Sequence, residues 1–410
     1  MISHQAYFEF LAGTDQTAPD WHPVLAGLAV LRLVDSRMRQ EPRGSRERDW
    51  ASFESARTAV SALNEGNPVR AILLQLVDAV SEEDIPGEVV GHALISYGRA
   101  LNFVGRWALA SDVFSMADRV AGAPANPRIS IESNIALGAA SRRMGDWDVS
   151  AHAYARAAHV ASTIGDSVGS LQVEVGLANT QLVHGNLPAA ELSLDQAIDQ
   201  ARANGWKDVL GLALHSRATV AHLRGAYADA VRLGYEALET MSDLTARDAA
   251  LSDLAAAFAG MGMRESARDS YLIVAATAQS QWVRWQATLN LMELAALDDQ
   301  EARFDAYARE LDTAALDPRL RAYYFLFLSA GQQRFGRYAE AEASLTEGLA
   351  IAEKNQLHQV AHEVSMAIGS LKSRKAARID VVVPAADVPA SLKRIAAELT
   401  SIREAALSSS

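Results

Sequence analysis

The chain contains no cysteine among its 410 residues. Disulfide bonds, a catalytic thiolate, iron–sulfur clusters and cysteine-ligated zinc are therefore excluded. A chain without thiols suits a reducing compartment, and we expect a cytoplasmic protein. The first residues, MISHQAYFEF, hold neither a basic segment nor a long apolar one, so no secretory signal is expected. No apolar run approaches the length of a membrane span, and the early run VLAGLAVL stops at Arg32.

Aromatic residues make up only 7% of the chain, although 50% of its residues are hydrophobic. Alanine supplies much of the difference, with 78 copies. Because alanine is the best helix former and a poor filler of wide cores, this composition favours closely packed helices over a large sheet. Lysine and arginine number 38 against 50 acidic residues, so the net charge is −12. That balance argues against a nucleic-acid-binding protein, whose affinity depends on basic side chains at phosphates.

Recognisable catalytic motifs are also lacking. The sequence has no G-x-x-x-x-G-K-[ST] phosphate loop and no G-x-S-x-G nucleophile motif. His358 and His362 lie four residues apart, but their order, HQVAHE, differs from the H-E-x-x-H of zinc proteases, and no third ligand is indicated. We therefore expect no enzymatic activity, no cofactor and no metal site.

A short phrase recurs along the chain: a glycine, one residue, an aromatic residue or leucine, two residues, then a small residue. Its glycines fall 40 residues apart, at Gly105, Gly145, Gly185 and Gly225. A degenerate copy begins at Gly262, and a full copy returns at Gly336. The 74 residues between those two glycines leave room for one further unit, at about 281–316, which lacks the turn glycine.

Each copy of the phrase predicts a helical hairpin. Residues with helical spacing precede the glycine, as at Leu94, Tyr97 and Leu101, and others follow it, as at Ala110 and Phe114. Glycine ends the first helix because it adopts a left-handed conformation at little cost. The aromatic residue two positions later is expected to fill the gap between the paired helices. One hairpin cannot bury its own apolar face, so neighbouring hairpins must stack.

This pattern resembles the tetratricopeptide-repeat (TPR) family over about 88–377, most of the chain. The family's signature places are occupied by Gly98 and Gly138, the turn glycines, the Trp or Tyr that follows them, and Ala110, Ala190, Ala230 and Ala341. The 40-residue period exceeds the usual period of about 34 and is similar to TPR-like arrays of bacterial signalling proteins. The resemblance implies an all-α solenoid, a right-handed superhelix of stacked hairpins. Arg264 replaces the aromatic in the fifth unit, and the missing glycine predicts a bend or altered packing in the sixth.

Four segments are expected along the chain. Residues 1–85 lack the phrase and show three helical stretches, at 23–39, 48–63 and 68–80, which either cap the array or form a small bundle with its own role. Residues 86–377 form an array of about seven hairpins. Residues 378–390 hold the run Val381 to Val383, followed by Pro384 and Pro389, and predict an extended linker. Residues 391–410 predict a C-terminal amphipathic helix.

The C-terminal helix has an apolar seam whose residues are alternately three and four apart: Leu392, Ile395, Leu399 and Ile402. The seam covers barely two heptads, which is too short to be stable alone. The helix must therefore dock on its own array, on a second copy of the chain, or on a partner protein. Docking on a second copy would make a homo-oligomer.

The TPR resemblance also implies a binding surface, because TPR superhelices usually bind ligands on a concave face formed by the first helix of each hairpin. The lining residues in this register include Ser96, Arg99, Asn102, Arg142, Arg143, Asn179, His215, Thr219 and His222. Asparagine and arginine there can hold the backbone or carboxylates of an extended peptide; otherwise they are ordinary solvated groups. Asn179 matches a place where peptide-binding members often carry asparagine, but the lysine expected beside it in chaperone-binding members is missing.

The favoured function is a non-enzymatic scaffold or adaptor that binds a partner protein or peptide through the concave face or through the C-terminal helix. The alternative is a peptide-responsive regulator, in which binding to the array controls the N-terminal helical unit. Bacterial peptide-sensing regulators have such a layout, although residues 1–85 show no convincing helix-turn-helix. An enzyme of unknown type is a third and weaker interpretation.

Overall fold

The computed structural model describes residues 3–18, 20–38, 46–82, 87–122, 125–314, 316, 318–355, 357–372 and 388–408, and every regular element in these ranges is an α-helix. The predicted all-α class, built from stacked helical hairpins, is thereby confirmed. The chain divides into two compact units, Met1–Gly185 and Asn186–Ser410. Among the described residues, no helix has the length and apolarity needed to cross a bilayer.

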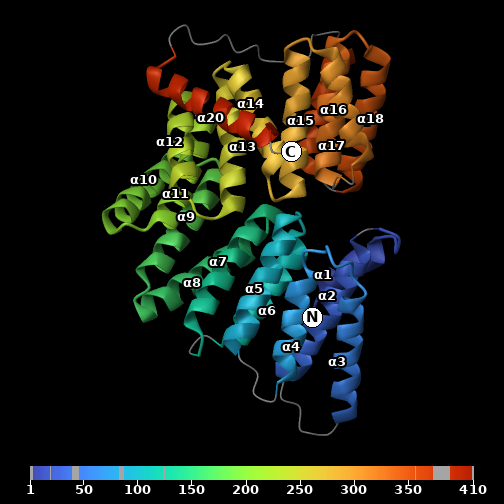
Figure 1. Ribbon diagram of the computed structural model, residues 1–410, viewed down its shortest axis with the longest axis vertical. Coiled ribbons are helices and arrows are strands. Elements are labelled where there is room, and N and C mark those ends of the chain that lie inside the picture. Colours follow the sequence, from blue (N-terminus) through green and yellow to red (C-terminus); the bar gives the residue numbers. More distant parts are fainter. Residues whose placement is uncertain are drawn as a thin grey trace. The chain divides into compact units, whose positions relative to one another are not determined.

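The described part of the first unit holds nine helices (Figure 1): α1 (Gln5–Gly13), α2 (Trp21–Met38), α3 (Arg46–Ser61), α4 (Arg70–Ser81), α5 (Gly87–Phe103), α6 (Trp107–Ala121), α7 (Pro127–Met144), α8 (Trp147–Ile164) and α9 (Ser167–Val183). The described part of the second unit holds eleven: α10 (Leu187–Asn204), α11 (Lys207–Leu223), α12 (Tyr227–Thr240), α13 (Leu244–Gly260), α14 (Arg264–Thr277), α15 (Gln281–Leu297), α16 (Glu301–Thr313), α17 (Pro318–Arg334), α18 (Tyr338–Lys354), α19 (His358–Lys372) and α20 (Ala390–Ser408).

The N-terminal helices share one core with the first hairpins. Buried side chains run from Tyr7 in α1 and Leu31 in α2 through Leu76 in α4 to Leu94 in α5. The three stretches predicted in 1–85 correspond to α2, α3 and α4, whereas α1 was not predicted. That helix is nine residues long and its N-cap residue, His4, makes no side-chain capping bond, so its start has no local signal. The boundary between units falls after Gly185, and the cap role of residues 1–85 stays a prediction.

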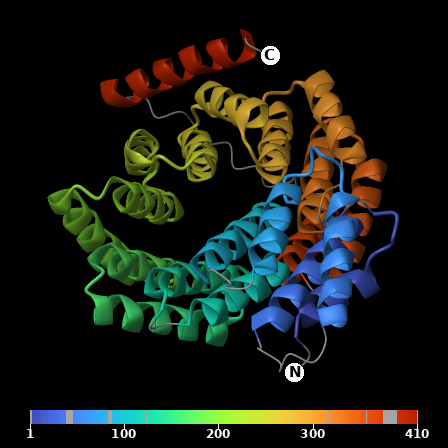
Figure 2. The same cartoon turned by 60° about the horizontal axis from the view of Figure 1, so that its bottom comes forward.

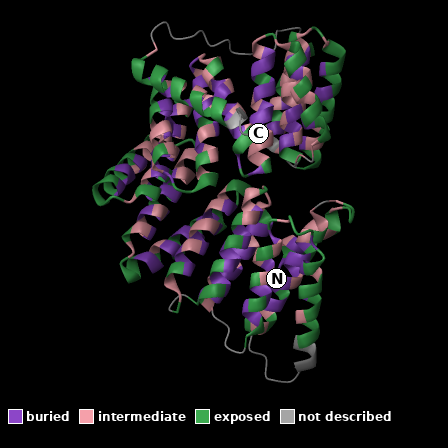
Figure 3. Ribbon diagram, in the orientation of Figure 1, coloured by how far each residue is buried: buried purple, intermediate pink, exposed green. Residues whose placement is uncertain are grey.

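Buried residues lie on the sides by which neighbouring helices meet, and exposed residues gather at the turns (Figure 3). The turn glycines take the left-handed conformation, with φ of 75° at Gly105, 78° at Gly145, 77° at Gly185 and 75° at Gly225. The N–H of Gly145 donates to Arg142 O at 3.1 Å, and the next N–H, of Asp146, donates to Ser141 O at 2.9 Å. These two bonds form a Schellman-type helix end, so the phrase sets where each first helix stops.

The sixth repeat, formed by α15 and α16, keeps this turn without a glycine. Asp299 lies between α15 and α16 with φ 56°, and its N–H donates to Ala296 O at 3.2 Å. The N–H of Gln300 donates to Ala295 O at 2.8 Å. Aspartate tolerates the left-handed conformation better than most residues, and its carboxylate accepts from the Arg334 guanidinium at 2.7 and 3.0 Å. The turn is therefore kept, because Asp299 replaces the glycine. The packing beyond it is altered, which is one of the two expected outcomes, since α17 lies mainly against α15 and touches α16 little.

The repeat period shortens partway along the chain. The turn positions 225, 262, 299 and 336 are 37 residues apart, whereas the earlier ones are 40 apart. The second helix of the hairpin takes up the change: α8 and α10 have 18 residues, and α12 and α14 have 14. The longer pair ends in the left-handed glycines Gly165 and Gly205, and the shorter pair ends in the extended residues Met241 and Ala278.

Tyr154 of α8 is held between two helix glycines. A Cβ atom at Gly138 would lie 2.9 Å from the Tyr154 ring, and a Cβ at Gly176 would lie 2.4 Å from it. The ring is 1% exposed, so α7, α8 and α9 pack around it. The predicted gap-filling role of the aromatic after the turn is wrong for Trp147, which is 38% exposed and contacts the His184 ring at 4.4 Å between centroids. It begins the second helix directly after the turn, at the closed end of the hairpin, where it meets the end of the next repeat's first helix, α9.

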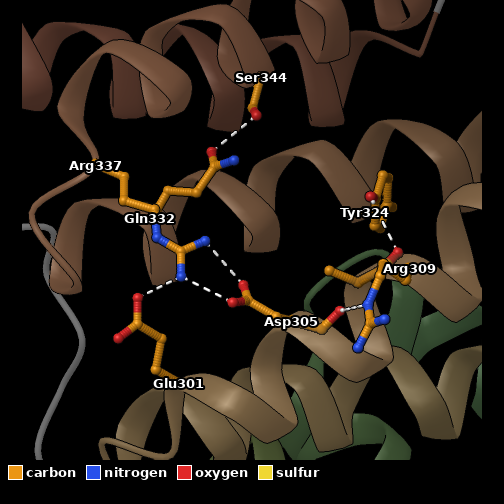
Figure 4. A network of polar contacts seen from close by, with 8 residues as sticks. Glu301, Asp305, Arg309, Tyr324, Gln332, Arg337 and Ser344 are labelled. Carbon is orange, nitrogen blue, oxygen red and sulfur yellow. Dashed lines mark hydrogen bonds and ion pairs between the residues drawn. The ribbon is translucent and has the colours of Figure 1, made fainter.

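Polar contacts join the hairpins of the second unit. The Arg337 guanidinium, just before α18, donates to the Asp305 carboxylate at 2.8 and 2.9 Å and also to Glu301, both on α16 (Figure 4). Between α17 and α18 the buried Ser344 hydroxyl donates to Gln332 Oε1 at 2.8 Å. In the fifth repeat, formed by α13 and α14, Arg264 replaces the aromatic residue. It donates to Asp298 at 3.1 Å and to the carbonyl of Leu297 at the end of α15.

Helix α20 docks on α12 and α14 of the same chain (Figures 1 and 2). Leu392, Ile395 and Leu399 are buried in the hydrophobic cluster of that region, and Ile402 stays 49% exposed. Of the three docking options left open by the sequence, the structure has the intramolecular one. The predicted linker 378–390 lies outside the described residues except for its last three positions.

Candidate functional site

Three of the predicted lining residues gather in the second unit. His215, Thr219 and His222 follow α11 at i, i+4 and i+7, so they share one face of that helix. Facing them is Asp253 on α13, which was not predicted. His215 Nε2 lies 2.8 Å from Asp253 Oδ2, and the Thr219 hydroxyl lies 3.5 Å from the same oxygen. The carboxylate thus ties the first helices of two consecutive hairpins together.

His222 has a hydrogen-bonding atom without a partner. Its Nδ1 is buried, and none of the described residues bonds to it. Burial lowers the pKa of His222 below its usual value of 6.5, because a partly desolvated imidazolium is disfavoured, while the charge of Asp253 acts in the opposite direction. The Tyr227 ring meets the imidazole edge-on at 5.3 Å between centroids. His222 therefore keeps one buried nitrogen to which no described residue bonds.

Small residues form a hollow beside these polar groups. The cavity measures about 70 Å³ and is lined by His215, Ala218, Thr219, His222, Ala230, Gly234, Ala250, Asp253, Leu254 and Ala256. We call it the α11–α13 pocket. Since one water takes up about 30 Å³ in the liquid, the hollow holds a small aliphatic group or two waters.

The groups of the α11–α13 pocket suit binding better than catalysis. The Thr219 hydroxyl donates to the carbonyl of His215 at 3.1 Å, and the His215 imidazole faces Asp253 instead of that hydroxyl. The hydroxyl proton of Thr219 is thus directed at a backbone carbonyl, and the imidazole is not aligned to accept it. The described residues contain no group of three or more metal-ligating side chains, and the side chain of His358 lies outside them. What the pocket supplies is a carboxylate acceptor, an unpaired imidazole nitrogen and a small apolar floor.

The predicted arginines of the first unit brace neighbouring helices. Arg99 of α5 pairs with Glu132 of α7, and Arg142 of α7 donates to the carbonyl of Gly176 in α9 at 3.1 Å. Arg143 lies over the Trp107 ring, 6.0 Å from its centroid. These three cations therefore already have protein partners, and they position the first helices of the hairpins.

Amide side chains on α5 and α9 lack hydrogen-bond partners among the described residues. Asn102 Oδ1 on α5 and Gln181 Oε1 on α9 are buried, and the described residues give neither a hydrogen-bond partner. Asn179 of α9 is half-buried, and no side-chain hydrogen bond joins it to the described part of the chain. Each of the helices α5, α9 and α11 thus carries, near its C-terminal end, one buried polar atom without a partner among the described residues: Asn102 Oδ1, Gln181 Oε1 and His222 Nδ1.

Asp253 and Glu132 could not be found from groups on one helix, because each lies on a different helix from its partner. Their partners lie about one repeat away: 38 residues separate His215 from Asp253, and 33 separate Arg99 from Glu132. The same spacing, 34 residues, separates Arg202 of α10 from Glu236 of α12. Opposite charges one repeat apart are therefore the signal that would have found these contacts.

A larger cavity, of about 620 Å³, lies in the first unit beside α1, α2 and α6. His4 is 2% exposed there, with Nδ1 2.8 Å from Asp112 Oδ2 and Nε2 3.3 Å from Asp35 Oδ2. Arg119 Nη2 lies 3.8 Å from the other Asp35 oxygen. Because His4 and Arg119 already face both carboxylates, these contacts serve to hold α1 on α2 and α6.

No family model matches the sequence, and no curated protein matches it. Among solved structures, the chain is similar to the crystal structure of a Rap protein complexed with competence and sporulation factor. The identity is 11%, the match covers 86% of this chain and 98% of that chain, and the TM-score is 0.43.

Proposed function

We propose that this chain is a TPR-like binding protein, which holds a segment of a partner protein or peptide on the first helices of its hairpins and catalyses no reaction. The α11–α13 pocket carries the proposal. Leaving a buried polar group such as His222 Nδ1 unpaired costs about 1–3 kcal/mol, which a ligand group bonded to it would offset. The ligand that fits has a small aliphatic side chain for the hollow and N–H groups for Asp253.

The amide groups of the first unit extend the same argument. Asn102, Asn179 and Gln181 can each bond to peptide backbone, since a primary amide both donates and accepts. Their cost of burial is offset when an extended peptide supplies the missing partners. Arg142 and Arg99, already paired within the unit, contribute by fixing the spacing of the helices.

A peptide-responsive regulator is the second candidate, supported by the continuity of the N-terminal core. Helix α4 packs on α5, and α1 packs on α6, so a change in that hairpin reaches the N-terminal helices directly. A protein of this kind would change the protection of α1–α4 from hydrogen exchange when a peptide binds.

Selection of peptides on the full-length chain tests the binding function. Peptides enriched from a random phage-displayed library are synthesised and titrated by calorimetry. We expect the pair His222→Ala and Asp253→Ala to weaken binding at least tenfold, which is about 1.4 kcal/mol, with unchanged helicity. Asn179→Ala is the corresponding change in the first unit.

The matched control lies on the second helix of the same hairpin. Asp229→Ala with Arg232→Ala removes an exposed ion pair of 3.1 Å within α12 and should leave peptide affinity unchanged. Equal affinity for the control and for the His222 and Asp253 variant would show that the pocket does not bind the peptide. A library that yields no binding peptide would remove the proposal altogether.

A further inference from the structure

We propose that the second unit binds a cationic side chain, lysine or arginine, of the same peptide that occupies the α11–α13 pocket. The site, here called the acidic patch, is defined by Asp253 of α13, Tyr271 of α14 and Glu293 of α15, three helices that pack on one another. The inference rests on the proposed function and adds to it the charge of the ligand. Because Asp253 also lines the pocket, the two sites adjoin.

The repeat places Glu293 on the same line of positions as the pocket. Thr219, Ala256 and Glu293 each lie six residues before the turn residue of their own hairpin, and the first two line the α11–α13 pocket. Equivalent positions of stacked hairpins face the same way, so Glu293 continues this line one hairpin further on. Asn179 and Arg99, two of the predicted lining residues, hold the same place in their hairpins.

Glu293 has no counter-charge in the described part of the chain. Neither a hydrogen bond nor an ion pair joins its carboxylate to the described residues. The side chain reaches solvent, yet the protein atoms around it displace enough water to raise its pKa above the usual value. Such a carboxylate attracts a cation more strongly than one on an open surface, because less water screens the attraction.

Tyr271 is a second group of the patch whose polar atom lacks a partner. Its side chain is 4% exposed, and no hydrogen bond joins its hydroxyl to the described residues. Burial raises the pKa of Tyr271 strongly, and the charges of Glu293 and Asp253 raise it further, so the hydroxyl lies near both carboxylates. A buried hydroxyl left without a partner is unfavourable, and a ligand that bonds to it removes that cost.

Asp253 contributes one unoccupied oxygen. His215 and Thr219 both face its Oδ2, at 2.8 and 3.5 Å, and no described residue bonds to Oδ1. The patch therefore presents acceptor oxygens from two carboxylates and a phenol. A guanidinium or ammonium group carries several N–H donors and no acceptor, so it fits this set, whereas an acidic side chain would be repelled.

Peptide selection on the full-length chain gives the first test. Peptides enriched from a random phage-displayed library should contain lysine and arginine more often than the unselected library does. The best of them is then synthesised with each lysine replaced by norleucine or each arginine by citrulline, which removes the charge and keeps much of the shape. We expect the neutral peptide to bind about tenfold more weakly by calorimetry.

The full chain with Glu293→Gln supplies the other half of a double-mutant cycle. This variant should also bind the basic peptide about tenfold more weakly, but it should bind the neutral peptide as the unchanged chain does, because the contact is already lost. The matched control is Glu265→Gln on α14, an exposed carboxylate without a bond to the described residues, which should leave both affinities unchanged.

The outcomes separate the acidic patch from the proposed function. Enriched peptides without basic residues overturn the patch and leave peptide binding standing. Additive losses from Glu293→Gln and the neutral peptide overturn it too, because the cation then contacts another part of the chain. If circular dichroism shows that Glu293→Gln does not fold, Tyr271→Phe takes its place in the cycle and decides in the same way. A library that yields no binding peptide removes both proposals.

Discussion

Replacing Gly176 by alanine adds one methyl group in front of the Tyr154 ring. The new Cβ would lie 2.4 Å from Cε1 and 2.7 Å from Cζ, where ordinary contact begins at 3.4 Å. The ring has little room to move, because α7 also packs on it so closely that a Cβ added at Gly138 would lie 2.9 Å from the ring. To make space, the ring or the whole of α9 has to shift by about 1 Å.

The size of the effect follows from two opposing contributions. Overpacking a tight core costs about 1–3 kcal/mol, and alanine returns about 1 kcal/mol through its helix propensity. We expect Gly176→Ala to lower the free energy of unfolding of the first unit by about 1–2 kcal/mol. With Tyr154→Leu the clash disappears, so the same substitution should raise the free energy of unfolding by about 1 kcal/mol.

Urea denaturation of the four chains of this cycle measures the coupling between the two positions. Its control is Gly369→Ala in α19, where a Cβ meets no heavy atom of the described residues within 4 Å, and which should stabilise by about 0.5–1 kcal/mol. The reasoning fails if Gly176→Ala has the same sign in both backgrounds, since the clash with the ring would then not be what decides it.

Three further predictions concern a docking contact, the pocket and a turn. The hydrogen bond to Glu398 raises the pKa of Tyr235 to about 12, so the stability that this contact adds is lost as pH rises from 10 to 12; ultraviolet titration should show this transition shifted down by Glu398→Gln and absent from Tyr235→Phe. The lowered pKa of His222 means that its contribution to stability is present above pH 6.5 and lost below it, so urea midpoints on either side of pH 6.5 should differ less in His222→Gln. Because the backbone at Asp299 is left-handed, we expect the free energy of unfolding of the Asp299→Val variant to be about 1–2 kcal/mol lower than that of Asp299→Gly in urea denaturation. Equal free energies would contradict the role given to this turn.

The fold could be predicted because its determinants are local. The left-handed glycine at Gly105 and its equivalents ends a helix through bonds to residues three and five positions back, so the spacing of the phrase carries the spacing of the hairpins. Asp299 escaped the pattern since the same turn is made by a different residue. The role of Trp147 was misjudged because its contact, His184, lies in the next unit.

The sequence predicts the residues of the candidate site that lie on α11 but not the one that lies on α13. Helical periodicity places His215 and His222 on a common face of α11, which is a local property. Which residue of α13 meets them depends on how two hairpins are offset when they stack, and that offset is set by side-chain packing, such as Leu254 against its neighbours. Asp253 therefore appears only in the structure, as does the pairing of Asp269 with Arg403.

The even spacing of the turns at 225, 262, 299 and 336 makes chain length an adjustable quantity. Removing residues 300–336 joins the left-handed turn at Asp299 directly to the start of α18, which then becomes the second helix after α15, with α12, α14 and α20 untouched. Duplication of the same segment lengthens the array without any new loop. The 40-residue repeats form a separate series, in which the second helices α8 and α10 are about one turn longer than α12 and α14 and end differently. Gain or loss of modules is thus expected within each series, in steps of its own period.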